Sequence, residues 1–278
     1  MTLESWPQRH PLISYFALAY GISWCGILAV LAATHFELAN LRPLDTGLIF
    51  MLMLLGPSAS GLSLTARLEG RAGMCRLWSS LAGWRVGKRW YAFALLTMPL
   101  VLLAVLWPLG TFLDPAFAPR FQWPLFAIGL VAGSFEEVGW TGFATPRLLA
   151  RHRPFMAGLG LGLLWAGWHV LVDLRQNFST MGFAWLLEFA VFYLAALTAY
   201  RVLMTWLYAK TQSLMLAVLM HASYTGRLFV LYPTTSFEQG LVWQTTFAVA
   251  LWLLVALVMV GFVHHPAKTG SAAATQRP

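Results

Sequence analysis

The sequence predicts an all-α fold, a polytopic membrane helix bundle of about eight transmembrane helices. The 278 residues are 59% hydrophobic and only 10% charged, and the mean hydropathy is +0.68, which is more apolar than the surface of a soluble domain allows. The apolar residues also gather in runs of about 20, the length that a helix needs to cross the hydrocarbon of a bilayer. Together these observations predict an integral membrane protein.

Eight apolar runs follow one another along the chain, separated by short polar or basic segments. They cover residues 12–33, 46–66, 90–110, 123–144, 154–172, 183–209, 213–231 and 241–263. The first run is longer than the hydrophobic core of a secretory signal, about 7–15 residues, so we interpret it as a membrane anchor. We expect one membrane domain over residues 1–278, with a short polar tail from about residue 266.

The basic residues predict the orientation of the bundle. With the amino terminus inside, fourteen of the eighteen Lys and Arg residues fall on inner segments, Arg201 and Lys210 among them. Cytoplasmic loops carry such an excess, so we expect both termini in the cytoplasm and the protein in the plasma or inner membrane. The net charge is +8. The basic residues responsible for it are scattered between the apolar spans and form no continuous stripe, so nucleic acid is not an expected partner.

The segment 67–89 is the most basic connection in the chain, with six basic residues and a single acid, Glu69. Met74, Leu77 and Trp78 recur in it at helical spacing, as a helix lying in the membrane interface requires. A merely basic linker explains the same residues equally well. Both interpretations place the segment in the cytoplasm.

Two adjacent carboxylates, Glu136 and Glu137, lie within the fourth apolar run. One carboxylate near the middle of a bilayer costs about 3 kcal/mol even on lenient insertion scales. Two in succession require a partner or a function, so the pair marks a candidate functional site.

Two later runs carry histidines, His169 in the fifth and His221 in the seventh. Polar side chains in a bundle face its interior, so these groups can meet Glu136. A carboxylate and imidazoles can activate water, the carboxylate taking a proton from it. Alternatively Glu136, His169 and His221 could hold a divalent metal such as zinc, but no His-Glu-x-x-His motif occurs and we expect no tightly bound cofactor.

Other polar residues have structural interpretations. Either histidine taken alone could simply bond a neighbouring helix. Asp173, Arg175 and Glu238 fall at the ends of runs, where we expect them to be solvated. Gly158 and Gly162 allow close packing of helices.

The three polar runs resemble the CAAX-protease and bacteriocin-processing family of intramembrane endopeptidases, also called ABI or Rce1-like. The family pattern is Glu-Glu-x-x-x-Arg, then an aromatic residue four positions before a His, then His-x-x-x-Asn. Here these motifs are EEVGWT from Glu136, WAGWH from Trp165 to His169, and HASYT from His221. The motif core covers about residues 123–226.

The resemblance implies that Glu136 is the base that activates water, with His169 and His221 beside it. Trp165 is a supporting residue, and Glu137 normally pairs with the motif arginine. This chain departs from the pattern at Thr141, in place of that arginine, and at Thr225, in place of the asparagine. Glu137 must therefore be protonated, be exposed to water, or pair with another cation such as Arg147 or Arg201.

Two classes of function follow from the resemblance. The first is an intramembrane endopeptidase that hydrolyses a membrane-associated peptide or protein in or near the lipid bilayer. The alternative is a non-proteolytic immunity or scaffold protein of the same fold, which the changes at Thr141 and Thr225 motivate. If Glu137 has lost its only partner, Glu137→Gln should be harmless and Thr141→Arg should be tolerated.

Overall fold

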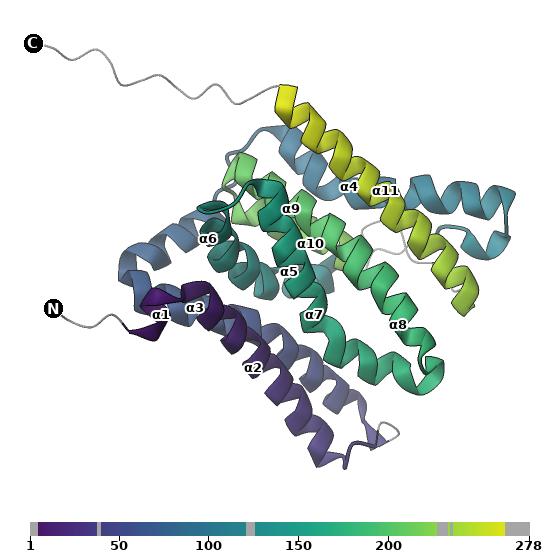
Figure 1. Ribbon diagram of the computed structural model, residues 1–278, viewed down its shortest axis with the longest axis horizontal. Coiled ribbons are helices and arrows are strands. Elements are labelled where there is room, and N and C mark those ends of the chain that lie inside the picture. Colours follow the sequence, from purple (N-terminus) through teal and green to yellow (C-terminus); the bar gives the residue numbers. More distant parts are fainter. Residues whose placement is uncertain (1–4, 38–39, 121–125, 227–232, 234–235, 265–278) are drawn as a thin grey trace, which may run out of the picture.

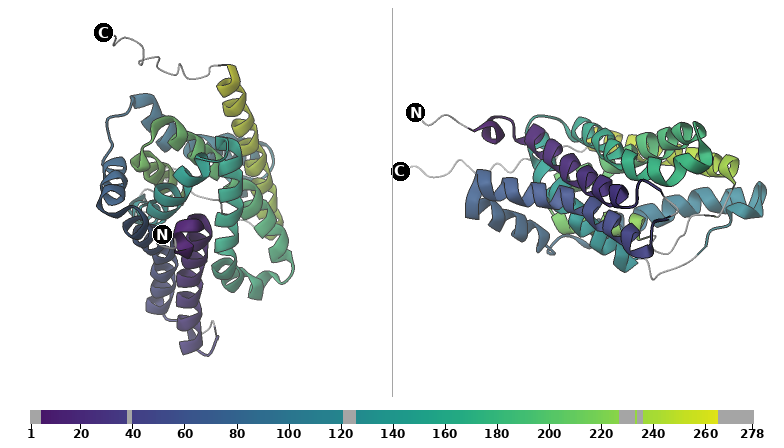
Figure 2. Two further views of the ribbon diagram at one scale, coloured as in Figure 1. Left: turned by 60° about the vertical axis from the view of Figure 1, so that its left-hand side comes forward. Right: turned by 90° about the horizontal axis from the view of Figure 1, so that it is seen from below.

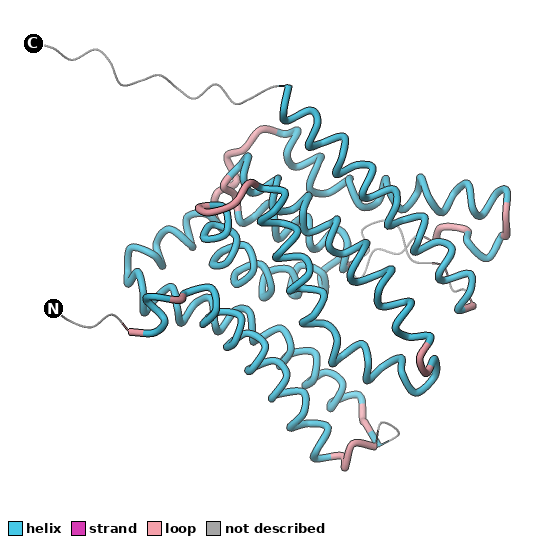
Figure 3. The backbone as a smooth tube through the Cα atoms, in the orientation of Figure 1, coloured by secondary structure: helices cyan, strands magenta, loops and turns pink. Residues whose placement is uncertain are grey.

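The long segments of the chain are helices, in agreement with the predicted all-α class (Figure 3). The structure is a computed structural model that describes residues 5–37, 40–120, 126–226, 233 and 236–264. The helices are α1 (Trp6–Arg9), α2 (Pro11–Ala33), α3 (Pro43–Leu81), α4 (Lys88–Phe112), η2 (Pro115–Phe117), α5 (Phe126–Gly139), η3 (Trp140–Ala144), α6 (Thr145–Leu149), α7 (Pro154–Met181), α8 (Ala184–Phe189), η4 (Ala190–Leu197), α9 (Thr198–Thr211), α10 (Leu214–Thr225) and α11 (Phe237–His264).

These helices form one segment for each of the eight predicted runs, because α5 continues through η3 into α6 and α8 continues through η4 into α9. Within the described residues, six helices are long and apolar enough to cross a membrane. The α5–α6 segment and the 12-residue α10 are not among the six. The protein is an integral membrane helix bundle. The end of the seventh predicted run, residues 227–231, and the tail from residue 266 lie outside the described residues.

The helix α3 is longer than its predicted run and includes most of the basic segment. A kink at Gly70, whose φ of 59° lies in the left-handed region, turns the chain before residues 71–81 continue as helix. Glycine adopts this φ without the steric cost that a Cβ brings. Beyond the kink this part of the basic segment is helical, which the linker interpretation did not predict. Leu77 is buried and Trp78 is exposed, so these two residues, which the interface-helix interpretation placed on one apolar face, lie in different surroundings.

The bundle has two outer pairs of helices around a central group (Figures 1 and 2). The helices α2 and α3 pack together at one edge, and α4 and α11 pack at the other. Between them α5 contacts both α3 and α10, while α7 packs along α9. All the candidate site residues are on these four central helices, α5, α7, α9 and α10, and on η3, which continues α5.

Small residues permit the close approach of α7 and α9, as predicted for Gly158 and Gly162. A Cβ on Gly158 would lie 2.7 Å from the Cα of Val202, and one on Gly162 would lie 2.8 Å from the Cα of Thr198. Real side chains do not approach backbone atoms so closely, so only glycine fits at these positions. The contact holds the histidine-bearing helix against the helix that carries Arg201.

The expectation that Asp173 is solvated is wrong. The helix α7 continues beyond the predicted run to Met181, and Asp173 is 8% exposed. The indole N–H of Trp185 donates a hydrogen bond to its carboxylate. Glu238 does lie at a helix end, in the first turn of α11, whereas the side chain of Arg175 lies outside the described residues.

We expect Gly139→Ala to destabilise the protein, because Gly139 is where α5 crosses α3. An added Cβ would lie 2.2 Å from the carbonyl oxygen of Pro57 and 2.5 Å from the Tyr15 hydroxyl. Overpacking of this kind costs about 1–3 kcal/mol, so the apparent Tm in detergent should fall. Gly160→Ala is the matched control, since no heavy atom lies within 4 Å of its added Cβ. Equal shifts for both variants would contradict this account of the α3–α5 contact.

Candidate active site

The two glutamates occupy the last turn of α5 and are buried, Glu136 with 5% and Glu137 with 0% exposure. The chain then changes from α-helix to the π-helix η3 at Trp140. Such π-helical turns are rare and occur often at functional sites. The Thr141 side chain, in η3, donates a hydrogen bond to Glu137 Oε2.

Glu137 is paired with Arg201 of α9. The guanidinium binds both carboxylate oxygens, Nη1 to Oε2 at 2.8 Å and Nη2 to Oε1 at 3.0 Å, and both side chains are fully buried. A bidentate pair of this geometry is the strongest arrangement that arginine makes with a carboxylate. Of the three alternatives given for Glu137, the structure shows pairing with another cation, Arg201. The condition under which Glu137→Gln should be harmless, the loss of its only partner, is therefore not met.

The second partner of Glu137 is His221 of α10, whose Nδ1 lies 2.8 Å from Oε1. An ionised carboxylate only accepts hydrogen bonds, so Nδ1 carries a proton, and in the neutral form of the ring Nε2 then carries a lone pair. The close approach of α10 to α5 depends on Gly133, because a Cβ there would lie 3.2 Å from the Cβ of His221. Glu137 thus fixes both the tautomer and the direction of the His221 ring.

Glu136 lies on the other side of the same imidazole. Its Oε1 is 3.7 Å from His221 Nε2, which is longer than a direct hydrogen bond. Its Oε2 accepts a hydrogen bond of 2.7 Å from the indole Nε1 of Trp165. One carboxylate oxygen is therefore fixed, and the other faces a nitrogen lone pair.

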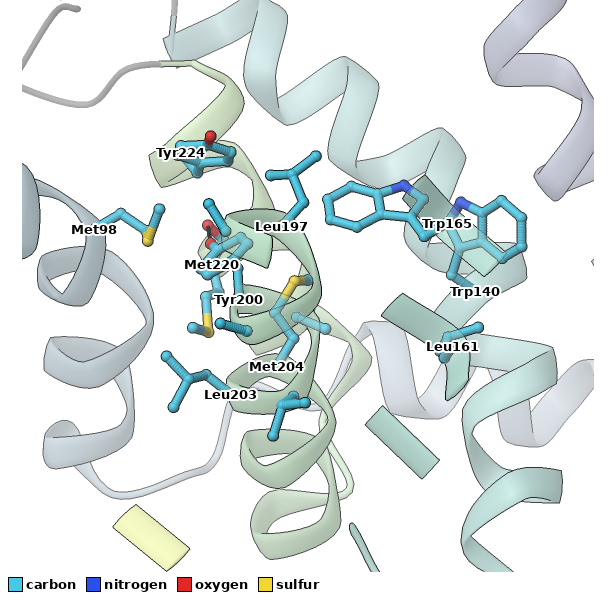
Figure 4. Close-up of a cluster of buried hydrophobic side chains, with 14 of the residues drawn as sticks. Met98, Trp140, Leu161, Trp165, Leu197, Tyr200, Leu203, Met204, Met220 and Tyr224 are labelled. Atoms are coloured by element: carbon cyan, nitrogen blue, oxygen red, sulfur yellow. Dashed lines mark hydrogen bonds between the residues drawn. The ribbon is translucent and has the colours of Figure 1, made fainter. Parts of the chain in front are cut away.

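Trp165 of α7 connects the polar groups of the site. The guanidinium carbon of Arg201 lies 4.1 Å from the centre of its ring, a cation–π contact. The rings of His169 and His221 contact it edge-on, with centroid distances of 5.3 and 5.6 Å. Trp165 also belongs to the buried apolar cluster that includes Tyr200 (Figure 4), so the polar site is anchored to the core of the bundle.

His169 lies one helical turn after Trp165. Its Nδ1 donates to the Trp165 carbonyl oxygen at 2.8 Å, since a carbonyl can only accept. Its Nε2 therefore also carries a lone pair. The ring packs against that of Tyr193 in the second π-helix, η4, with centroids 5.1 Å apart.

The structure brings together most of the predicted site residues. Glu136, Glu137, His169, His221, Trp165 and Thr141 lie in one connected cluster. Thr225 does not join them, because it is the last residue of α10 and its side chain is exposed. Arg147, the other cation proposed for Glu137, pairs with Glu69.

Arg201 is the site residue that the sequence interpretation undervalued. The charge pattern places Arg201 among the cytoplasmic basic residues, and the sequence offers it only as one possible partner of Glu137, but it is completely buried. The signal was available, since an arginine between apolar residues of a predicted span requires a carboxylate partner. The bundle offered several carboxylates, so the sequence alone did not single out Glu137.

The donor atoms do not fit the three-ligand metal site that Glu136, His169 and His221 would form. Among the described residues, no group of three or more His, Cys, Asp and Glu side chains is arranged to hold a metal ion. The Nδ1 hydrogen bonds of both histidines leave each Nε2 with its lone pair, so it is the arrangement of the three donor groups, and not their hydrogen bonding, that does not fit a metal ion. We derive no step that passes through a metal.

The fold and this cluster define a class of protein, a polytopic membrane protein with a buried carboxylate and imidazole centre between its helices. Residues 118–226 match the family described as type II CAAX prenyl endopeptidase Rce1-like. A stretch of 100 residues is 27% identical to the protein named CAAX prenyl protease 2 of Methanococcus maripaludis. That stretch covers 35% of this chain and 37% of the relative, so the alignment spans little more than a third of either protein.

These matches agree with the resemblance drawn from the three motifs, and the similarity to the Rce1-like family is carried by residues 118–226. The matching family and the relative are both named as CAAX prenyl proteases. The matched residues contain every member of the cluster around Glu136.

Proposed function

We propose that the protein is an intramembrane endopeptidase in which Glu136 activates water to hydrolyse a peptide bond of a membrane-associated protein or peptide. The proposal rests mainly on one observation. One carboxylate oxygen of Glu136 is held by a hydrogen bond, while the other oxygen faces Nε2 of His221. Glu136 Oε1 faces His221 Nε2 at 3.7 Å, while Trp165 holds Oε2 at 2.7 Å.

In the proposed reaction a water molecule donates one hydrogen to Glu136 Oε1 and the other to His221 Nε2. Glu136 takes a proton as the water oxygen attacks the peptide carbonyl carbon, which gives a tetrahedral intermediate and a protonated carboxyl group. The same carboxyl group then returns the proton to the leaving amine nitrogen as the C–N bond breaks. The Nε2 of His169 is an acceptor in its present tautomer, which suits it to orient water.

Glu137 and Arg201 are positioning residues in this proposal. Glu137 orients His221 through Nδ1, and Arg201 neutralises Glu137. This chain has Thr141 where the family pattern has an arginine. The site still contains a cation, because Arg201 of α9 supplies it. This relocation favours the protease over the non-proteolytic alternative.

A cleavage assay tests the proposal. The purified protein is reconstituted in lipid vesicles with a library of membrane-anchored peptides, and the products are identified by mass spectrometry. We expect new peptide ends that depend on the protein and are absent with Glu136→Ala. A library left intact by the wild-type protein, together with a stable complex with one membrane protein, would favour the immunity or scaffold function.

We expect cleavage to proceed without a tightly bound metal, because the donor atoms of the site do not form a three-ligand set. Activity should survive dialysis against a strong chelator, and elemental analysis of the active protein should find less than stoichiometric zinc. Loss of activity with chelator that added zinc restores would overturn the metal-free reaction. Glu136 would then be a ligand and no longer the only activator of water.

We also propose that both termini lie in the cytoplasm, because thirteen Lys and Arg residues besides the buried Arg201 fall on the segments that this orientation places inside, against four outside. Arg76→Cys in a Cys75→Ala background places a reporter cysteine in the basic part of α3, where the Arg76 side chain is exposed, and Cys25 is the second cysteine of this variant. A membrane-impermeant thiol reagent should label it in inverted vesicles and not in intact cells. The remaining cysteine, Cys25, is exposed on α2, so a Cys25→Ala variant is the control. Labelling in intact cells would invert the orientation.

A further inference from the structure

A cavity lies away from the glutamates, where α4 begins and α9 ends. Its volume is about 610 Å³, and it is lined by Arg89, Trp90, Phe93, Trp206 and Lys210. The first three residues belong to the first two turns of α4, and the other two belong to the last two turns of α9. The helix α4 is long and apolar enough to span a membrane, and α9 is the last part of another such segment, Ala184–Thr211. The cavity lies at the ends of these helices and therefore at the level of the lipid headgroups.

The walls of this cavity are aromatic. The ring of Trp206 lies 5.6 Å from that of Trp90 and 5.2 Å from that of Phe93, measured between centroids. Tryptophan is enriched at membrane interfaces because its ring is apolar and its N–H is polar. Walls of this kind suit the upper part of a lipid acyl chain.

The charge of the cavity favours an anion. Arg89 and Lys210 are the two ionisable groups among the five lining residues, and both are cations. The Arg89 guanidinium lies 5.0 Å from the Trp90 ring, and its side chain is exposed. The first turn of α4 has no acidic residue, and its N-cap, Gly87, has no side chain to cap it. The positive end of this 25-residue helix therefore adds to the field of the two cations.

We propose that this cavity binds the headgroup of an anionic phospholipid. The phosphate lies between Arg89 and Lys210, and the acyl chains run down the aromatic wall formed by Trp90, Phe93 and Trp206. Basic pockets between membrane helices recognise anionic headgroups in this way. A free phosphate would gain nothing from the aromatic wall, and an acidic peptide would need a partner on the lipid-facing side of the bundle. Both are tested below as alternatives.

Native mass spectrometry of the detergent-purified full chain measures the binding. The protein is titrated with phosphatidylglycerol, and in parallel with phosphatidylcholine as the neutral lipid. The test variant is Arg89→Gln/Lys210→Gln. The matched control is Arg85→Gln/Lys88→Gln, which removes the same charge from the same end of the bundle but from residues that do not line the cavity. Circular dichroism and the apparent Tm check folding, and Arg89→Gln alone serves if the double variant unfolds.

We expect the test variant to bind phosphatidylglycerol about thirty-fold more weakly, which corresponds to about 1 kcal/mol for each cation. Its binding of phosphatidylcholine should not change, and the control variant should bind both lipids as the wild type does. Equal losses in the two variants would mean a diffuse surface charge and overturn the site. Displacement of the lipid by inorganic phosphate or by an acidic peptide would assign the cavity to that ligand and also overturn the proposal.

Discussion

Arg201→Met is expected to lower the free energy of unfolding by about 3–5 kcal/mol, the usual cost of breaking a buried ion pair. The substitution leaves the Glu137 carboxylate buried, with the Thr141 hydroxyl and His221 as its remaining partners. It also removes the cation that packs on Trp165. The apparent Tm in detergent, followed by circular dichroism, gives the size of the loss. We expect Glu137→Gln to lower the free energy of unfolding by a comparable amount, because it leaves the buried Arg201 without its carboxylate partner.

A double substitution distinguishes the interaction energy between Arg201 and Glu137 from the separate contribution of each side chain. Replacing both partners by apolar residues, as in Arg201→Met/Glu137→Met, removes both buried charges and should cost less than the two single changes together. Additive losses would mean that Arg201 and Glu137 stabilise the bundle independently. That result would contradict the coupling derived from their bidentate contact.

The position of the arginine can be exchanged between helices. In wild-type protein Thr141→Arg should destabilise, because Thr141 is 2% exposed and a second cation would crowd the same carboxylate. This reverses the expectation from sequence that the change is tolerated. In an Arg201→Thr background, however, Thr141→Arg places a cation one helical turn from Glu137, and we expect it to recover at least part of the lost stability and cleavage. If neither stability nor cleavage recovers, the arginine must be on α9, at position 201, to stabilise the protein and support cleavage.

Glu136→Gln is expected to reduce cleavage by about 10²–10⁴-fold, the usual contribution of a general base. Glutamine has nearly the shape of glutamate and can still accept the Trp165 hydrogen bond, so the apparent Tm should change little. An amide cannot take a proton from water, which is the reason for the expected loss. The measurement is the initial rate of cleavage of a peptide identified in the library assay.

Glu188→Gln is the matched control for this prediction. Glu188 is another glutamate within the bundle, bonded by Gln244 of α11 at 3.1 Å, and it takes no part in the proposed reaction. Its conversion to glutamine should leave the cleavage rate unchanged. Equal losses from Glu136→Gln and Glu188→Gln would mean that the carboxylates support the fold and that Glu136 is not the base.

Much of the fold follows from hydrophobic patterning, and this is why it could be predicted. A run of about 20 apolar residues must satisfy its own backbone hydrogen bonds in lipid, and a helix does so within one segment. The eight helical segments therefore coincide with the eight predicted runs. Their ends were less accurate, since α3 and α7 continue through polar residues that pack against other helices, as Asp173 does with Trp185.

The sequence by itself determined the membrane bundle, the order of its helices and the polar residues that must meet inside it, because the cost of polar groups in lipid acts on each segment separately. Only the tertiary structure decided which polar groups are partners. Arg201 is 64 positions from Glu137, and no local spacing relates them. Their pairing depends on how closely α5, α7, α9 and α10 approach, which glycines such as Gly133 and Gly162 permit and which only the packed side chains of the whole bundle fix.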